Sequence, residues 1–170
     1  MKKEIEVKFK IDNIDNIKKQ IVDFGAHFGD SYKQTTYGFF SDNSVEKGIF
    51  PRIRDEDNDI VLTVKVRPKE QTNYFERDEY SMKIPNLKEG EEILKALGFN
   101  SVKVFKKLRQ ECEFLNTKIS LDKLYFGDFI EIEGEKNDIE NVINKLNLSS
   151  KERIIKSYLR LEDDYKKRKL

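Results

Sequence analysis

The stretch Glu4-Ile5-Glu6-Val7-Lys8-Phe9-Lys10-Ile11 alternates strictly between charged and apolar residues. Such a period of two predicts a β-strand, because successive side chains of a strand point to opposite faces. One face of this strand is apolar. The other face is charged and is formed by Glu4, Glu6, Lys8 and Lys10.

The same alternation recurs along the rest of the chain. It predicts further strands at 33–40, 49–55, 59–67, 74–84, 102–115, 117–121 and 128–133. Apolar residues at helical spacing predict helices at 13–24, 86–97 and 138–146. A last helix, capped by Ser149 or Ser150, is predicted to carry Ile154, Ile155, Tyr158 and Leu159. Many strands with short connections indicate an α+β fold, in which an antiparallel sheet is closed or nearly closed and helices lie outside it.

Length and charge limit the classes of protein that fit. The chain has 170 residues, of which 33 are Lys or Arg and 32 are Asp or Glu, so its formal net charge is +1. This length predicts one domain over residues 1–170, with a frayed basic tail at 165–170. The 12 Phe and 7 Tyr argue against wholesale disorder. The balanced charge argues against a nucleic-acid partner, because such binders carry a basic excess.

Cysteine and histidine are too few for several chemistries. The single cysteine, Cys112, can form neither an internal disulfide nor a multi-cysteine zinc site, and we expect it to be a buried apolar side chain. The single histidine, His27, follows a predicted helix and is expected in a loop, which excludes a zinc site built on several histidines. No stretch approaches the ~20 apolar residues of a membrane span, and no apolar leader begins the chain, so we expect a cytoplasmic protein without a membrane partner.

The charged strand faces are sorted by sign. Acids dominate the first and last strands, and bases dominate the middle ones: Glu4, Glu6, Glu131 and Glu133 against Arg52, Arg54, Lys65, Lys107 and Arg109. If these faces point inward, the sheet encloses a charged lumen. Carboxylates suit hard cations such as Mg²⁺ or Mn²⁺, and arginine matches the geometry of phosphate, so the pattern favours polyphosphate or nucleotide chemistry. The alternative is a set of solvated strand faces with cross-strand salt bridges, each worth little.

Seven short motifs, in order along the chain, resemble those of the CYTH family, which is named for the adenylate cyclase CyaB and thiamine triphosphatase and is also called the triphosphate tunnel metalloenzymes. They begin with the Glu-x-Glu-x-Lys signature at 4–8 and end with Gly-x-Phe-x-Glu-Ile-Glu at 127–133. Between them stand Arg52-Ile53-Arg54, Thr63-Val64-Lys65, Arg77-Asp78-Glu79, Phe105-Lys106-Lys107-Leu108-Arg109 and Leu121-Asp122-Lys123-Leu124.

The resemblance implies a fold and a set of site residues. The fold would be a closed eight-stranded antiparallel barrel, the triphosphate tunnel, with helices packed outside. One or two Mg²⁺ or Mn²⁺ ions would be held by Glu4, Glu6, Asp122, Glu131 and Glu133. Phosphate would be bound by Lys8, Arg52, Arg54, Lys65, Arg77, Lys107 and Arg109. Catalytic roles would fall to Glu4, Glu6, Lys8, Lys65 and Glu79.

The resemblance also implies an activity on a small triphosphate. We expect a metal-dependent phosphohydrolase of inorganic, nucleoside or thiamine triphosphate. The alternatives are a class IV adenylate cyclase, which makes cyclic AMP and pyrophosphate from ATP, and a binding module without turnover. A purely structural barrel is a further reading. Related proteins often dimerise, so a homodimer is an open expectation.

Two local features refine the comparison with the family. The stretch Gln34-Thr35-Thr36-Tyr37-Gly38-Phe39-Phe40 lacks the acid that the family often carries there, so no site role is assigned to it. The ending Ser157-Tyr158-Leu159-Arg160-Leu161 resembles that of CyaB-type members. Its alternative reading is an amphipathic helix that docks Tyr158 and Leu161.

Overall fold

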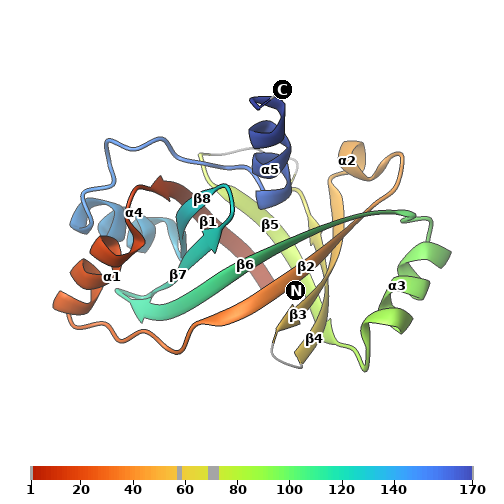
Figure 1. Cartoon of the computed structure of the whole chain (residues 1–170), viewed down its shortest axis with the longest axis horizontal. Coiled ribbons are helices and arrows are strands. Elements are labelled where there is room, and N and C mark those ends of the chain that lie inside the picture. The colour runs from red at the N-terminus through yellow and green to blue at the C-terminus, as the bar shows by residue number, and fades with distance from the viewer. Residues whose placement is uncertain (1, 57–58, 69–72, 170) are drawn as a thin grey trace. The chain divides into compact units, whose positions relative to one another are not determined.

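A computed structural model describes residues 2–56, 59–68 and 73–169. Eight strands form a closed antiparallel barrel in the order β1-β5-β4-β3-β2-β6-β7-β8, which confirms the predicted fold class (Figure 1). The strand ends differ from the predicted ones by at most three residues. The bounds are β1 Lys2–Ile11, β2 Tyr32–Phe40, β3 Ile49–Glu56, β4 Asp59–Val66, β5 Phe75–Lys83, β6 Ser101–Phe114, β7 Thr117–Leu124 and β8 Gly127–Glu133.

The helices are α1 (Ile14–Asp23), α2 (Ser44–Lys47), α3 (Leu87–Ala96), α4 (Lys136–Lys145) and α5 (Tyr158–Lys167). Asn13 caps α1 and Asn86 caps α3, each by accepting a backbone N–H through its side chain. The sequence did not predict α2, which has 4 residues and is too short for a helical period to be visible.

The C-terminal region departs from the prediction in two ways. The last helix begins at Tyr158 and is capped by Ser157, whereas Ile154 lies in an isolated bridge opposite Lys8. Residues 165–167 belong to this helix, so the prediction of a frayed tail is wrong for them. Lysines at the end of a helix interact favourably with its dipole, and Lys166 Nζ also lies 2.8 Å from Glu162 one turn earlier.

The chain divides into two compact units, which we describe separately. The first comprises the described residues within 1–4, 33–71 and 76–106. Phe39, Ile53 and Leu94 form its buried apolar core. Helix α3 approaches this core closely at Gly90, where a Cβ atom would lie 2.8 Å from Ile53 Cδ1. A larger residue here would force the terminal methyl groups of Ile53 and Ile84 to move.

The second unit comprises the described residues within 5–32, 72–75 and 107–170. The apolar face of β1 packs here in one core with the apolar faces of β7 and β8 and with α1 and α4. The core residues include Ile5, Val7, Phe9, Ile11, Ile21, Ile119, Ile130, Ile132, Ile139, Val142 and Ile143. Each such side chain stabilises the fold by about 1.5–3 kcal/mol. The apolar faces thus meet helices, as predicted, and the opposite faces carry the charges.

The two isolated chemical groups behave as expected. Cys112 is a buried free thiol, and burial, aided by the charges of Glu113 and Glu111, raises its pKa to about 11. His27 is exposed in the loop after α1. Neither residue adds to a site.

Candidate active site

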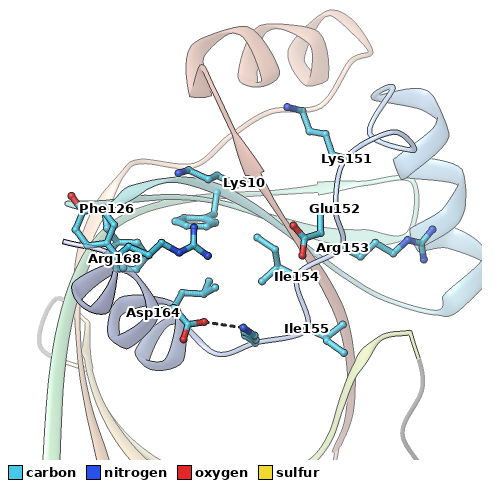
Figure 2. A pocket seen from close by; sticks show the side chains of 13 residues that line it. Lys10, Phe126, Lys151, Glu152, Arg153, Ile154, Ile155, Asp164 and Arg168 are labelled. Atoms are coloured by element: carbon cyan, nitrogen blue, oxygen red, sulfur yellow. Dashed lines mark hydrogen bonds and ion pairs between the residues drawn. The ribbon is translucent and has the colours of Figure 1, made fainter. Parts of the chain in front are cut away.

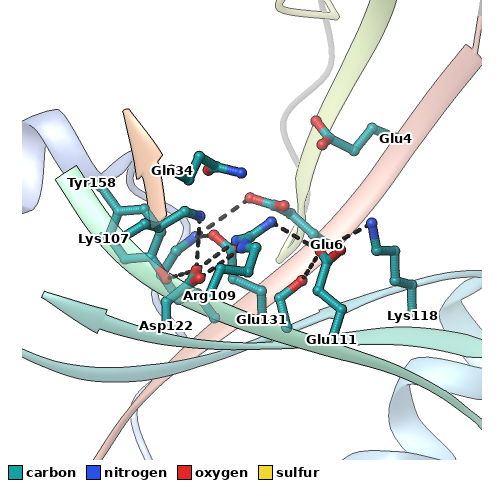
Figure 3. A network of polar contacts seen from close by, with 12 residues as sticks. Glu4, Glu6, Gln34, Lys107, Arg109, Glu111, Lys118, Asp122, Glu131 and Tyr158 are labelled. Carbon is teal, nitrogen blue, oxygen red and sulfur yellow. Dashed lines mark hydrogen bonds and ion pairs between the residues drawn. The ribbon is translucent and has the colours of Figure 1, made fainter. Parts of the chain in front are cut away.

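A buried charge cluster lies in the second unit and centres on Arg109 of β6. Its guanidinium forms a bidentate interaction with the Asp122 carboxylate: Nε donates to Oδ1 at 2.6 Å and Nη2 donates to Oδ2 at 2.5 Å. Nη2 also donates to Glu131 Oε2. Lys8 Nζ lies 2.8 Å from Glu131 Oε1 and 3.4 Å from Glu6 Oε1. Figure 3 shows Glu6, Arg109, Asp122 and Glu131 converging from β1, β6, β7 and β8.

Strand register explains why these residues meet. Arg109 lies opposite Asp122 in the β6–β7 pair, and Lys8 lies opposite Glu131 in the β1–β8 pair. Residues directly opposite each other in an antiparallel pair share a face, with Cβ atoms about 4.5–5.5 Å apart. The alternation seen in the sequence therefore places the charges on one face, and the register pairs cations with acids.

Burial and ion pairing act together on the pKa values in this cluster. Burial alone would raise the pKa of Glu131, but the charges of Lys8, Arg109 and Lys107 outweigh it and hold that pKa well below its ordinary value. Burial alone would lower the pKa of Lys8, but Glu131 and Glu6 outweigh it and raise that pKa. The same balance, with Glu131 and Asp122, raises the pKa of Arg109. All three groups are thus ionised over the whole neutral range.

Asp122 accepts hydrogen bonds from two further side chains. Lys107 Nζ donates to its Oδ2 at 3.0 Å, and the hydroxyl of Tyr158 donates to the same oxygen at 2.7 Å. Its side chain is 0 % exposed. The sequence placed Lys107 and Asp122 in the site, but it gave Tyr158 no role beyond helix docking. The Ser-Tyr-x-x-Leu ending was the available signal.

Glu111 extends the cluster along β6 and was not predicted as a site residue. Its carboxylate accepts hydrogen bonds from Ser120 at 2.8 Å and from Tyr32 at 2.9 Å. Burial would raise its pKa, but the charge of Arg109 and the hydrogen bonds from Lys118 and Ser120 lower that pKa to about 2. Alternation places Glu111 on the same strand face as Arg109, so the sequence carried this signal.

A second charge cluster lies in the first unit, around Lys65 of β4. Lys65 Nζ donates to both oxygens of Glu4, at 2.5 Å for Oε1, and lies 3.2 Å from Glu79 Oε2. Arg52 Nη2 lies 3.6 Å from that same Glu79 oxygen. Lys65 and Glu79 are opposite in the β4–β5 register. Burial would raise the pKa of Glu79, but Lys65 and Arg52 outweigh it and lower it.

The other predicted bases of this unit have separate contacts. Arg54 Nε lies 3.2 Å from Glu56 Oε1, and the Arg77 guanidinium lies 5.9 Å from the centre of the Phe50 ring. Arg77 also donates to the carbonyl of Glu76. The structure therefore brings Glu4, Arg52, Lys65 and Glu79 together in the first unit, with Arg54 and Arg77 outside that group of ion pairs.

Two polar residues of β2 were missed from the sequence. Gln34 is 1 % exposed and Thr36 is 3 % exposed. Within the described residues, Gln34 Oε1 and Thr36 Oγ1 have no hydrogen-bond partner. Thr36 lies opposite Arg54 in the β2–β3 register. We assigned no site role to this strand because it lacks the acid that the family often carries there. Its polar residues nevertheless alternate along the strand, as the site residues of other strands do.

The predicted metal ligands fit a divalent cation through their donor chemistry. In the part of the chain that the structure describes, no group of three or more His, Cys, Asp or Glu forms a metal-binding cluster. Glu6 and Glu131 nevertheless converge on one cation, the Lys8 ammonium, and Glu133 lies opposite Glu6 in the strand register. Mg²⁺ is usually held by one or two carboxylates together with substrate phosphates and water, so the pair suffices for that mode.

A cleft of about 440 Å³ lies elsewhere in the second unit, between Lys10 of β1, the segment 151–156 and α5 (Figure 2). Its cations are largely paired with acids: Lys151 with Asp12, Arg153 with Glu140 and Lys156 with Asp164. These pairs hold the segment against its neighbours. The ion pairs at this cleft therefore hold the segment 151–156 in place, and none of the predicted site residues lines the cleft.

Comparison with known proteins identifies the family. The sequence model of the CYTH domain matches residues 2–158, so the chain belongs to the CYTH family. A protein named putative adenylate cyclase MJ0240, from Methanocaldococcus jannaschii, is 29 % identical over 174 residues, which cover 93 % of this chain and 97 % of that protein. The family prediction is thereby confirmed.

Solved structures share the fold. The PH1012 protein from Pyrococcus horikoshii superposes with a TM-score of 0.80 at 28 % identity, over 93 % of this chain and 98 % of that chain. HpAC1 from Hippeastrum, described as a putative adenylyl cyclase with a dominant triphosphatase activity, has a TM-score of 0.65 at 15 % identity, over 95 % and 94 % of the two chains.

Named members of the family indicate a broad class of chemistry. CYTH members are adenylate cyclases or triphosphatases that act on small triphosphates such as ATP, and the family is generally metal-dependent. Among the helices that the structure describes, none has both the length and the apolar character needed to cross a membrane.

Proposed function

We propose that the protein is a divalent-metal-dependent phosphohydrolase of a triphosphate, either inorganic triphosphate or a nucleoside or thiamine triphosphate. One observation carries the proposal: Lys8, Lys107 and Arg109 are buried, and each is ion-paired with Asp122 or Glu131. Buried cations on a strand face, opposite an apolar core, are costly for stability alone and suit an anionic ligand.

These cations suit a chain of phosphates for physical reasons. Arginine presents a planar fork of donors that matches phosphate oxygens, and lysine supplies a compact point charge. Because water is largely excluded from the buried cluster, each interaction with phosphate is stronger there than at the surface. We propose that Lys8, Lys107 and Arg109 of the second unit bind phosphate groups of the substrate. We propose the same role for Arg52, Arg54, Lys65 and Arg77 of the first unit.

The carboxylates have a matching role in the proposal. Glu6, Asp122, Glu131 and Glu133 of the second unit would hold Mg²⁺ or Mn²⁺. The same role is proposed for Glu4 of the first unit. When bound, such an ion neutralises charge on phosphate oxygens and activates the nucleophile. The protein's own part is to orient the phosphates through its cations. Glu79, paired with Lys65 and Arg52, would keep these two cations in place.

A second candidate is a class IV adenylate cyclase, in which the ribose 3′-hydroxyl attacks the α-phosphorus of ATP. The relative from Methanocaldococcus jannaschii, at 29 % identity, favours it by name. Hydrolysis is preferred because it needs only a positioned water, whereas cyclisation also needs a site for base and ribose.

We further propose that the two units act as one cytoplasmic CYTH domain, since the family match at 2–158 includes residues of both. Nucleic acid and membrane are not expected partners, and a homodimer remains the proposed assembly. Sedimentation at several protein concentrations would test the assembly.

The test is a substrate panel. The protein is incubated with tripolyphosphate, ATP or thiamine triphosphate, each with Mg²⁺, Mn²⁺ or a chelator. We expect metal-dependent release of phosphate from at least one substrate. Release of cyclic AMP and pyrophosphate from ATP would instead identify the cyclase.

The panel also tests the binding module. If the protein only binds, no substrate yields product, and Glu133→Ala leaves tripolyphosphate affinity unchanged. Tight binding without turnover would therefore contradict an enzymatic function and support a binding module. A protein that neither binds nor turns over any of these substrates would support a purely structural barrel.

A further inference from the structure

Tyr158, the first residue of α5, is brought into the second-unit cluster by the segment before it. Arg153 is ion-paired with Glu140 of α4 at 2.7 Å, and the Ile154 N–H donates to the Lys8 carbonyl of β1 at 2.8 Å. Figure 2 shows this segment between β1 and α5. Tyr158 thus enters the cluster from a segment that is fixed on both sides.

The ring of Tyr158 lies against two of the proposed phosphate-binding lysines. Lys8 Nζ is 4.7 Å and Lys107 Nζ is 4.9 Å from the ring centre. The ring forms an edge-to-face pair with Phe129, with 5.3 Å between centroids. Cations at this distance from an aromatic face are attracted to it, most strongly where water is excluded. Tyr158 is 5 % exposed, so both contacts are desolvated.

The hydroxyl has a different task. It donates to Asp122 Oδ2, the same oxygen that accepts from Lys107 and from Arg109. When Lys107 turns toward a phosphate, Asp122 loses one of its cationic donors. A buried carboxylate that loses a donor is costly, so Lys107 is released easily only if another donor stays in place.

We propose that Tyr158 is a positioning residue of the phosphate site: its neutral hydroxyl keeps Asp122 hydrogen-bonded while Lys107 engages the substrate, and its ring aligns Lys8 and Lys107. The inference rests on the proposed function.

The test compares two Tyr→Phe variants by calorimetric titration with tripolyphosphate, with and without Mg²⁺. Tyr158→Phe keeps the ring and removes the bond to Asp122. Tyr125→Phe is the matched control, because the Tyr125 hydroxyl donates to Glu162 at 2.7 Å and so fastens the same helix outside the cluster. We expect Tyr158→Phe to weaken binding about tenfold and Tyr125→Phe to leave it unchanged.

A third variant separates positioning from helix docking. In an Asp122→Asn background the carboxylate charge is gone, so adding Tyr158→Phe should weaken binding less than twofold, whereas a docking role would give the same tenfold loss in both backgrounds. Equal effects in the two backgrounds, equal effects of both Tyr→Phe variants, or wild-type affinity in Tyr158→Phe would each overturn the inference. If the wild type binds tripolyphosphate but turns over no substrate, the proposed hydrolysis is refuted. The role of Tyr158 is still tested in that case, because it is measured through the affinities of the variants and not through turnover. If the wild type binds none of tripolyphosphate, ATP and thiamine triphosphate, both proposals are refuted.

Discussion

The two charge clusters use the same residue types but differ in their contact with water. In the second-unit cluster, the side chains of Lys8, Lys107 and Asp122 are 2 %, 3 % and 0 % exposed. In the first-unit cluster, Lys65 and Glu4 are 10 % and 9 % exposed, but Arg52 and Glu79 are each 20 % exposed. An ion pair in a dry site contributes little net stability while intact, yet breaking it is costly. The buried ion pairs of the second cluster are therefore costly to break without a compensating ligand, whereas Arg52, which is more exposed, can change partner at lower cost.

The largest loss of stability is expected when a shared acceptor of the second cluster is removed. Asp122→Ala removes the acceptor shared by Lys107, Arg109 and Tyr158 and leaves two buried cations without it. We expect the free energy of unfolding to fall by about 3–5 kcal/mol. Glu79→Ala, in the wetter cluster, should cost about 1 kcal/mol. Urea denaturation of both variants measures the difference, and similar losses would show that the clusters do not differ in desolvation.

Activity should not follow stability. Lys107→Ala in one cluster and Arg52→Ala in the other each remove a proposed phosphate contact. We expect each to lower kcat/KM about 100-fold, because charge stabilisation in a site is lost in either case. Steady-state kinetics on the preferred triphosphate measures both. If only one variant loses activity, only its cluster binds substrate.

The pH dependence of stability should be dominated by the second cluster. The pKa of Glu111 falls from an ordinary value of 4.5 to about 2 in the folded protein. A depressed folded pKa gives stability that is present above about pH 4.5 and is lost as the pH falls toward 2, because the unfolded chain takes up the proton first. Glu131 adds in the same direction.

The matching variant isolates this contribution. In Glu111→Gln the loss of stability between pH 5 and 2 should shrink by on the order of 2 kcal/mol. Urea midpoints at several pH values measure it. An unchanged pH profile in the variant would mean that Glu111 is not held ionised by Arg109, Lys118 and Ser120.

The smallest effect is expected for an exposed ion pair, which serves as a control for the loss of a charge as such. Lys83 and Asp59 form an ion pair in the first unit whose side chains are 72 % and 61 % exposed. Lys83→Ala should change the free energy of unfolding by less than about 0.5 kcal/mol and leave kcat/KM unchanged, since exposed pairs contribute little. A larger loss in either quantity would show that charge removal alone, wherever it occurs, accounts for the other variants.

Much of the fold could be predicted because a period of two is visible wherever a strand has one apolar face. The stretch at 4–11 gave both the strand and its charged face, and the same holds for the strand that contains Glu131. The helix start at Tyr158 was harder, because Ser149, Ser150 and Ser157 are all acceptable caps and only packing selects one.

Most residues of the site could be predicted from the sequence, but the ion pairs and hydrogen bonds between them could not. The sequence suggested that Asp122 and Arg109 belong to one site, yet a bond between them depends on strand register, which alternation does not fix. Glu111 and Gln34 were missed because one lies beyond its motif and the other lies where the family pattern fails. Tyr158 reaches the cluster from a helix 36 residues after Asp122 in the chain, a contact that no local pattern encodes.

A crystal structure with tripolyphosphate and Mg²⁺ would show whether the buried cations bind a triphosphate. We expect phosphate oxygens within hydrogen-bond distance of Lys107 and Arg109, with Tyr158 still bonded to Asp122. Tripolyphosphate bound instead in the cleft beside Lys10 and the segment 151–156, with Lys107 and Arg109 still paired only to Asp122 and Glu131, would contradict this expectation.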